Sequence, residues 1–122
     1  MNDEKYILKK KKILIEHGFT YSQFPNELSF QKSGRSIVFH TKNSELIDVC
    51  FYTFGDDLKE FSFNFKWTEF KDPKTTNAIQ NIFNQDDKLL VIDSMFAFII
   101  SNEEWFNSVN ENEINNYFKF RD

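Results

Sequence analysis

The chain has 122 residues, of which 40% are hydrophobic and 28% are charged, and its formal net charge is −4. This length and composition indicate one soluble globular domain with a single core, and they exclude an intrinsically disordered chain. The acidic balance argues against a nucleic-acid-binding protein, because such proteins obtain much of their affinity by neutralising phosphates with basic side chains.

Cysteine use and apolar patterning indicate the compartment. Cys50 is the only cysteine, so no internal disulfide is expected, and a reducing cytoplasm is the simplest location. The longest apolar stretch, LLVIDSMFAFII, is interrupted by Asp93 and Ser94 and is too short to span a bilayer. The N-terminus lacks the apolar segment of a signal peptide. We therefore expect a cytoplasmic protein, and its many Lys, Asn, Ile and Phe residues are typical of an AT-rich bacterial or phage genome.

The first predicted element is a helix over residues 3–17. Ile7 and Leu14 lie on one line of this helix, and Gly18 suits its C-terminal end. His17 falls in the last turn, where the helix dipole favours a protonated imidazole. We therefore expect a structural role for His17.

Residues 9–12 of this helix are all lysines, which raises the alternative of a nucleic-acid-binding module that also uses Trp67. On a helix, however, these lysines fan around the circumference and form no stripe. Lys10 and Lys11 lie near the apolar face, where their methylene stems can cover it while the ammonium groups stay in water. We therefore favour a solvated helix, and nucleic-acid binding stays an alternative.

Four segments with strand-like alternation follow. They are NELSFQK (26–32), RSIVFHT (35–41), ELIDVCFYTF (45–54) and EFSFNFKWTEF (60–70). Turn-forming residues separate them, at 33–34, 42–44 and 55–57. Short connections between consecutive strands predict an antiparallel meander.

Each predicted strand carries apolar side chains at alternate positions, so the sheet is expected to have one continuous apolar face. The residues of this face are Leu28, Phe30, Ile37, Phe39, Ile47, Val49, Phe51, Phe61, Phe63, Phe65 and Trp67. Soluble proteins rarely leave so large an apolar surface in water. We therefore expect amphipathic helices of the same chain to cover it.

The segment 71–87 is predicted to be a second helix. Asp72 is a candidate N-cap, and Pro73 suits the first helical position. The next segment, KLLVIDSMFAFIIS, is interpreted as a buried β-hairpin with strands at 89–92 and 96–100 that turns at Asp93 and Ser94. One long bent strand is the alternative.

The C-terminal residues are predicted to form two short helices. Ser101 with Glu104 and Asn110 with Glu113 have the spacing of capping boxes. The apolar residues after each box occupy different helical faces, which indicates a break near Asn110. Together the elements predict a two-layer α+β fold, in one domain over residues 1–122.

The opposite, polar face of the sheet is the first candidate binding surface. Its residues include His40, Asp48, Tyr52, Glu60, Asn64 and Lys66. A histidine with a carboxylate can do acid–base chemistry, so a small enzyme that uses His40 with Asp48 or Glu60 is one alternative function. Cys50 shares this face, and we expect it to be a small space-filling residue.

No sequence motif indicates a metal or a cofactor. The two histidines are distant in sequence, the chain has one cysteine, and no glycine-rich phosphate loop or nucleophile elbow occurs. We therefore expect no metal, no cofactor and no catalytic activity.

An acidic cluster near the C-terminus is the second candidate binding surface. It comprises Glu103, Glu104, Glu111 and Glu113, close to Trp105, Phe106, Tyr117 and Phe118. Aromatic side chains among carboxylates suit an interface with a basic protein. The alternative is that the acids stabilise helix N-termini while the aromatics pack on the sheet.

In size, acidity, single-domain build and lack of catalytic motifs, the whole chain resembles bacterial immunity proteins, which neutralise toxins delivered between competing cells. This resemblance rests on general character and carries over no particular residue. It implies a non-catalytic module that binds a cognate, often basic toxin domain by shape and charge. The polar sheet face and the acidic C-terminal cluster are the surfaces that we expect to bind the partner.

Overall fold

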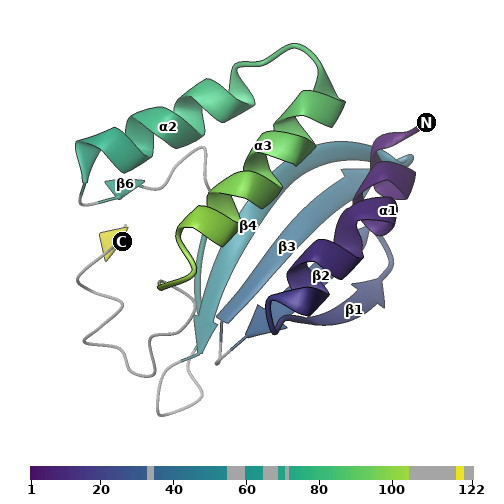
Figure 1. Cartoon of the computed structure of the whole chain (residues 1–122), viewed down its shortest axis with the longest axis horizontal. Helices are drawn as coiled ribbons and strands as arrows, with labels where there is room; N and C mark the ends of the chain where they lie inside the picture. Colours follow the sequence, from purple (N-terminus) through teal and green to yellow (C-terminus); the bar gives the residue numbers. More distant parts are fainter. Residues whose placement is uncertain (33–34, 55–59, 65–68, 71, 105–117, 120–122) are drawn as a thin grey trace.

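The computed structural model describes residues 1–32, 35–54, 60–64, 69–70, 72–104 and 118–119. Helices pack on one face of an antiparallel sheet, so the predicted two-layer α+β fold is confirmed (Figure 1). The helices are α1 (Asp3–Glu16), α2 (Pro73–Phe83) and α3 (Lys88–Ser101). The strands are β1 (Thr20–Phe24), β2 (Glu27–Lys32), β3 (Arg35–Lys42), β4 (Glu45–Phe54), β5 (Glu60–Asn64), β6 (Glu69–Phe70) and β7 (Phe118–Lys119).

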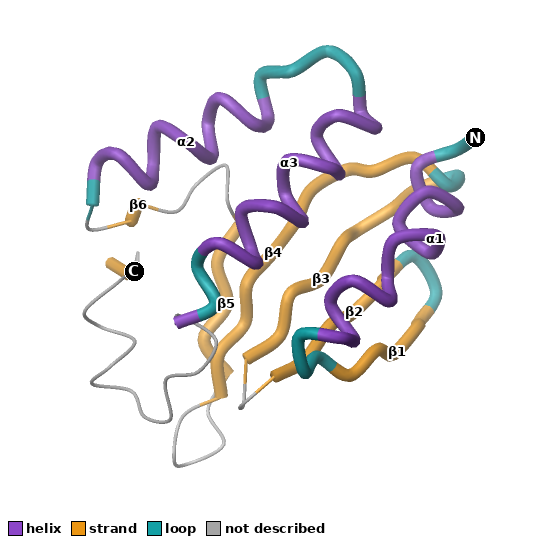
Figure 2. Tube along the Cα trace, in the orientation of Figure 1, coloured by secondary structure: helices purple, strands orange, loops and turns teal. Residues whose placement is uncertain are grey.

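The main sheet is a meander in the order β1-β2-β3-β4-β5, with every neighbouring pair antiparallel (Figure 2). The four predicted strands correspond to β2 to β5, but the last one, predicted over 60–70, is only partly confirmed. Its first residues form β5, whereas residues 69–70 form β6 in a second sheet and residues 65–68 lie outside the described residues. Asn43 (φ 52°) and Ser44 (φ 66°) form the tight turn from β3 to β4. Positive φ at both central residues gives a hairpin turn whose twist matches that of the strands.

Strand β1 was not predicted from the sequence. Its residues, TYSQF, lack a regular apolar alternation, and it lies at the edge of the sheet, where one neighbour suffices. The signal for it is the turn at Pro25 and Asn26, where Asn26 has φ 63°. Tyr21 packs its ring on Phe30, with 5.2 Å between the ring centroids, and this contact attaches β1 to the core.

The hydrophobic core lies between the sheet and the helices α1 and α3, which run side by side over it (Figure 1). At its centre the rings of Phe30, Phe39 and Phe96 pack together, with centroid distances of 5.5 to 5.9 Å. The predicted covering of the apolar sheet face is therefore confirmed for β2 and β3. Of the row 61–67, Phe65 and Trp67 lie outside the described residues, and only the backbone of Phe61 and Phe63 is described.

Residues 88–101 form a helix, α3, and the predicted β-hairpin is wrong. The segment is apolar nearly throughout, so its alternation alone does not distinguish strand from helix. Its buried residues recur with helical spacing: Val91, Ile92, Met95, Phe96 and Ile99. The start signal is Asp87, which is the N-cap and accepts a hydrogen bond from the Leu89 backbone N–H at 2.9 Å. None of the described helices is both long and apolar enough to cross a membrane.

The other helices begin as predicted, although α2, predicted over 71–87, ends at Phe83. Asp72 caps α2 and Pro73 is its first residue, as predicted. The helix α1 ends at Glu16 and is followed by Gly18 with φ 93°. At the C-terminus, the predicted helix start at Ser101 is wrong, because Ser101 is the last residue of α3 and Asn102 is its C-cap. Phe118 was predicted to be helical, but it pairs with Phe70 in the small β6-β7 sheet. The remaining residues of the predicted C-terminal helices, 105–117, lie outside the described residues.

A β-bulge in β4 changes which residues face the core. His40 pairs with Asp48, whereas Thr41 pairs with Leu46, so Ile47 is an extra residue between two pairs. Leu46 is therefore 4% exposed and Ile47 is 44% exposed. The prediction that Ile47 lies in the core and Leu46 outside is wrong, because the strand does not alternate regularly along its whole length.

Candidate functional site

The outer face of the main sheet, opposite α1 and α3, carries small side chains at its centre, two of which are serines. Four of its residues, Ser29, Ser36, Val38 and Cys50, are each at most 9% exposed, and none belongs to the core cluster on the other face. The hydroxyl oxygens of Ser29 and Ser36 lie 3.0 Å apart and share a hydrogen bond. The middle of this face is thus closely packed, and Cys50 lies where it borders the end that carries His40 and Asp48.

At that end, the register brings three chemically different side chains together. His40 on β3 lies directly opposite Asp48 on β4, and Cys50 follows two residues further along the same face. One ligand atom of each, an imidazole nitrogen, a carboxylate oxygen and the thiol sulfur, lies within 4.8 Å of the other two. The Cys50 thiol donates to Asp48 Oδ1 at 3.6 Å. His40 and Asp48 are half-buried and Cys50 is buried.

Glu27 lies on the other side of His40. It pairs with His40 across the β2-β3 ladder, and its Oε1 is 3.9 Å from His40 Nδ1. The imidazole therefore has a carboxylate on each flank, with Asp48 on β4 and Glu27 on β2. The separation of 3.9 Å from Glu27 is an ion-pair distance and is too long for a hydrogen bond.

Two exposed apolar side chains flank this group. Phe24 is 52% exposed and pairs with Glu27 at the end of the β1-β2 hairpin, which places it on the outer face. Ile47, the bulge residue, directly precedes Asp48 in the chain and is 44% exposed. We call Phe24, Glu27, His40, Ile47 and Asp48 the outer-face patch. It combines apolar contact area with two carboxylates.

The other described residues that were predicted for the polar face lie on β4 and β5, further from this patch. Asn64 pairs with Cys50, and Tyr52 pairs with both Ser36 and Ser62. Glu60 pairs with Phe54 at the far end of β5. Lys66 lies outside the described residues. Of the predicted set, the structure thus brings His40 together with Asp48, and it places Glu60 at the other end of the strands.

The acidic C-terminal cluster is only partly described. Glu103 contacts His17 Nδ1 in an ion pair, which joins the end of α1 to the residues after α3. Glu104 is exposed, whereas Glu111 and Glu113 lie outside the described residues. His17 has the structural position that was predicted, and its acidic partner is the additional finding.

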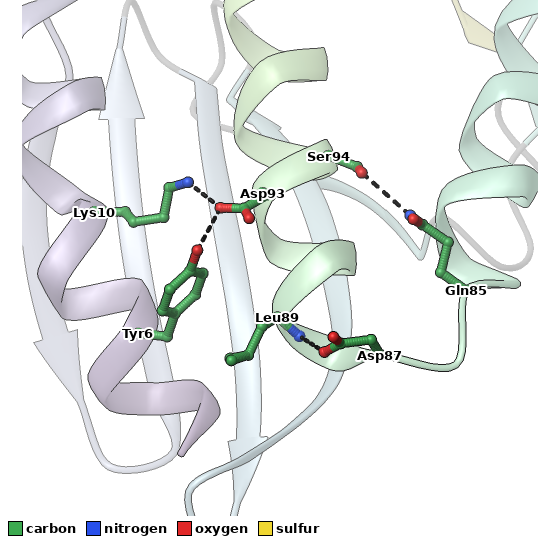
Figure 3. A network of polar contacts seen from close by, with 7 residues as sticks. All are labelled: Tyr6, Lys10, Gln85, Asp87, Leu89, Asp93 and Ser94. Atoms are coloured by element: carbon green, nitrogen blue, oxygen red, sulfur yellow. Dashed lines mark hydrogen bonds and ion pairs between the residues drawn. The ribbon is translucent and has the colours of Figure 1, made fainter. Parts of the chain in front are cut away.

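A polar network joins α1 to α3 on the helical side of the molecule (Figure 3). Tyr6 donates to Asp93 Oδ1 at 2.8 Å, and Lys10 contacts the same oxygen. The Lys10 ammonium holds the pKa of Asp93 below its ordinary value, and Tyr6 acts in the same direction. The hydrogen bond to Asp93 in turn raises the pKa of Tyr6. Asp93 is therefore a helix-to-helix anchor and not a turn residue.

The lysine run behaves as a solvated helix segment. Lys10 binds Asp93, and Lys11 places its ammonium 5.0 Å from the centroid of the Tyr21 ring. Lys9 and Lys12 are exposed. The lysines thus point in different directions, as predicted, and Trp67 lies outside the described residues.

From the sequence, His40, Asp48 and Cys50 were all placed on one face, and Cys50 was interpreted as a space-filling residue. Glu27 was not considered, although the antiparallel pairing of β2 with β3 places it opposite His40. The signal that could have found it is the pairing register.

No protein-family model matches this chain, and no curated protein or solved structure is significantly similar to it.

Proposed function

We infer that the chain is a non-catalytic protein-binding module of the immunity type, which binds and neutralises a cognate bacterial toxin in the cytoplasm. The observation that supports this proposal is the outer-face patch. Phe24 and Ile47 expose apolar surface beside the carboxylates of Glu27 and Asp48. Exposed aromatic residues are frequent energetic anchors of interfaces, and acidic groups around them steer a basic partner toward the contact.

The outer-face patch is favoured over the acidic C-terminal cluster as the contact surface. Glu103 is already engaged with His17, so binding a partner there would compete with a contact inside the chain. The outer-face patch, in contrast, lies on strands that the core holds in place. A rigid surface loses little conformational entropy on binding.

The test is a binding measurement against the product of the adjacent upstream gene, by pull-down and calorimetry at low salt. Phe24→Asp and Ile47→Asp are expected to weaken binding by about tenfold or more each, since a charge replaces apolar contact area. Leu90→Asp is the matched control, because Leu90 is 50% exposed on α3, on the opposite layer. Absence of binding at low salt, or equal effects of all three variants, contradicts the proposal.

A second candidate is a small enzyme that uses His40 with Asp48. The observation that favours it is that both side chains lie within reach of the Cys50 thiol. In such a site the imidazole accepts a proton from a nucleophile while the carboxylate orients it. An activity screen with His40→Ala distinguishes the two functions: a hydrolytic or transfer activity lost in this variant supports the enzyme, and binding without activity supports the module.

A further inference from the structure

We propose that His40, Asp48 and Cys50 bind one zinc ion on the outer face of the sheet, with Glu27 orienting the imidazole. This differs from the expectation of the sequence analysis that no metal is bound. That expectation counted cysteines and histidines along the chain, whereas the site arises from two neighbouring strands. The proposal does not rest on the proposed binding function.

The donor set selects the class of metal. A thiolate, an imidazole and a carboxylate are together the ligands of zinc sites, which take sulfur, nitrogen and oxygen donors. Ca²⁺ and Mg²⁺ take oxygen ligands and gain nothing from the Cys50 sulfur or the His40 nitrogen. The combination at this site therefore favours Zn²⁺ over the hard cations.

The distances require only a small adjustment. A tetrahedral centre with bonds of about 2.0 to 2.3 Å separates its ligand atoms by about 3.3 to 3.8 Å. The Cys50 sulfur and Asp48 Oδ1 are already 3.6 Å apart, and all three ligand atoms lie within 4.8 Å of one another. Rotation of the half-buried His40 and Asp48 side chains can shorten the longer separations without moving the backbone.

The strands place these ligands in a fixed arrangement. His40 and Asp48 are directly paired, and the bulge at Ile47 sets the position of Asp48 relative to the turn. Cys50 pairs with Val38 in the closely packed centre of the outer face, and both residues are at most 9% exposed. Ligands on well-packed strands keep their geometry better than ligands on loops.

Glu27 has the position of an outer partner of the imidazole. It lies on β2, on the opposite flank of His40 from Asp48 and Cys50, with Oε1 3.9 Å from Nδ1. Histidine ligands usually donate their second ring N–H to such a carboxylate, which fixes the tautomer and raises the basicity of the ligating nitrogen. With Nδ1 directed to Glu27, the proposal assigns Nε2 to the metal.

Three protein ligands leave one coordination position for water or for a group of another molecule. The His40 side chain is 25% exposed, so the ion can enter from solvent and this fourth position can be reached. Binding requires a deprotonated thiol and a neutral imidazole, so the affinity is expected to fall as the pH is lowered.

The experiment uses the whole chain, reduced and freed of metal, titrated with Zn²⁺ by calorimetry and with Co²⁺ by absorption spectroscopy. One ion per chain is expected, with ligand-field bands in the visible and a thiolate-to-cobalt charge-transfer band in the near ultraviolet. Cys50→Ser is expected to abolish the charge-transfer band, and His40→Ala to lower the Zn²⁺ affinity by at least about 100-fold. Glu27→Gln is expected to lower it by about 10- to 100-fold.

Two substitutions away from the site serve as matched controls. His17→Ala removes the other histidine, and Asp86→Asn removes an exposed acid; neither should change the affinity. Circular dichroism of each variant checks that it is folded. The spectrum of the unsubstituted chain is decisive even if a variant fails to fold: absence of saturable Co²⁺ uptake, or uptake without the thiolate band, overturns the proposal. Equal losses in the His17→Ala and His40→Ala variants also overturn it.

Discussion

Asp3, in the first turn of α1, accepts a hydrogen bond from the backbone N–H of Leu46 in β4 at 2.7 Å. The backbone carbonyl oxygen of Leu46 accepts a hydrogen bond from Lys88 Nζ, at the start of α3, at 2.9 Å. Leu46 is the last residue before the bulge. Both covering helices are therefore tied by their first residues to the strand segment that carries Ile47 and Asp48.

Loss of the Asp3 carboxylate is expected to destabilise the protein. Asp3 is 9% exposed, so Asp3→Ala leaves the Leu46 N–H buried without its acceptor, and the free energy of unfolding should fall by about 1 to 3 kcal/mol. Asp3→Asn keeps an acceptor oxygen and should recover part of this loss. Urea denaturation measures both, with Asp86→Ala as the control at an exposed acid. Equal stability of Asp3→Ala and the control contradicts this role.

The bulge predicts that two neighbouring residues contribute very differently to the free energy of unfolding. Leu46→Ala should lower the free energy of unfolding by about 2 to 4 kcal/mol, because Leu46 is in the core cluster. Ile47→Ala should lower it by less than about 1 kcal/mol, because Ile47 is 44% exposed. The same denaturation series tests this pair. A larger loss for Ile47→Ala than for Leu46→Ala would show that β4 alternates regularly and has no bulge.

The bulge could have been predicted from the sequence. The two-residue turn at Asn43 and Ser44 pairs Thr41 with Leu46, and continuing that register would put His40 opposite Ile47. The apolar patterns of the two strands then disagree, because Val49 would share a face with Val38 instead of Phe39. Inserting one extra residue removes the conflict, since a shift of one position exchanges the two faces of a strand. The grouping of His40 with Asp48 follows directly from that correction.

Asp93 is expected to stabilise the protein above an acidic limit. Its pKa is lowered in the folded state, so its contribution is present above its ordinary pKa of about 3.9 and is lost as the pH falls through the lower folded value. The Asp93 side chain is 37% exposed, and solvent screening limits the effect of Asp93→Asn to about 1 kcal/mol at neutral pH. Denaturation at neutral pH and near pH 3 should show this difference shrinking in acid. A difference that is constant with pH contradicts it.

Tyr6 is expected to stabilise the protein only below an alkaline pH. Its pKa is raised in the folded state, first by the hydrogen bond to Asp93, so its contribution is present below its ordinary pKa of about 10 and is lost as the pH rises through the folded value. The stability difference between the unsubstituted chain and Tyr6→Phe should therefore decrease above about pH 10. Tyr21→Phe is a control with a different cause, since burial raises the pKa of Tyr21 and no bond to Asp93 is involved.

In the second half of the chain, the apolar pattern alone was insufficient to predict the secondary structure. In α3 nearly every residue is apolar, so a period of two and a period of 3.6 fit equally well, and Asp93 with Ser94 was interpreted as a turn. In the structure both are used by neighbouring elements: Asp93 binds α1, and the Ser94 hydroxyl accepts from Gln85 Nε2 at 3.1 Å (Figure 3). These partners are distant in sequence or in the preceding loop, and local periodicity does not report them. The N-cap at Asp87 was the one local signal for a helix.

A proline at position 94 distinguishes the helix from the predicted hairpin. Ser94 is in the middle of α3, where proline removes a backbone hydrogen bond and clashes with the preceding turn, so Ser94→Pro should cost about 3 kcal/mol or more. Ser94→Ala, which loses only the contact with Gln85, should cost no more than about 1 kcal/mol. Circular dichroism and thermal unfolding of the two variants measure the difference. In a hairpin, position 94 would be a turn position that accepts proline, so a proline variant as stable as the alanine variant would contradict the helix α3.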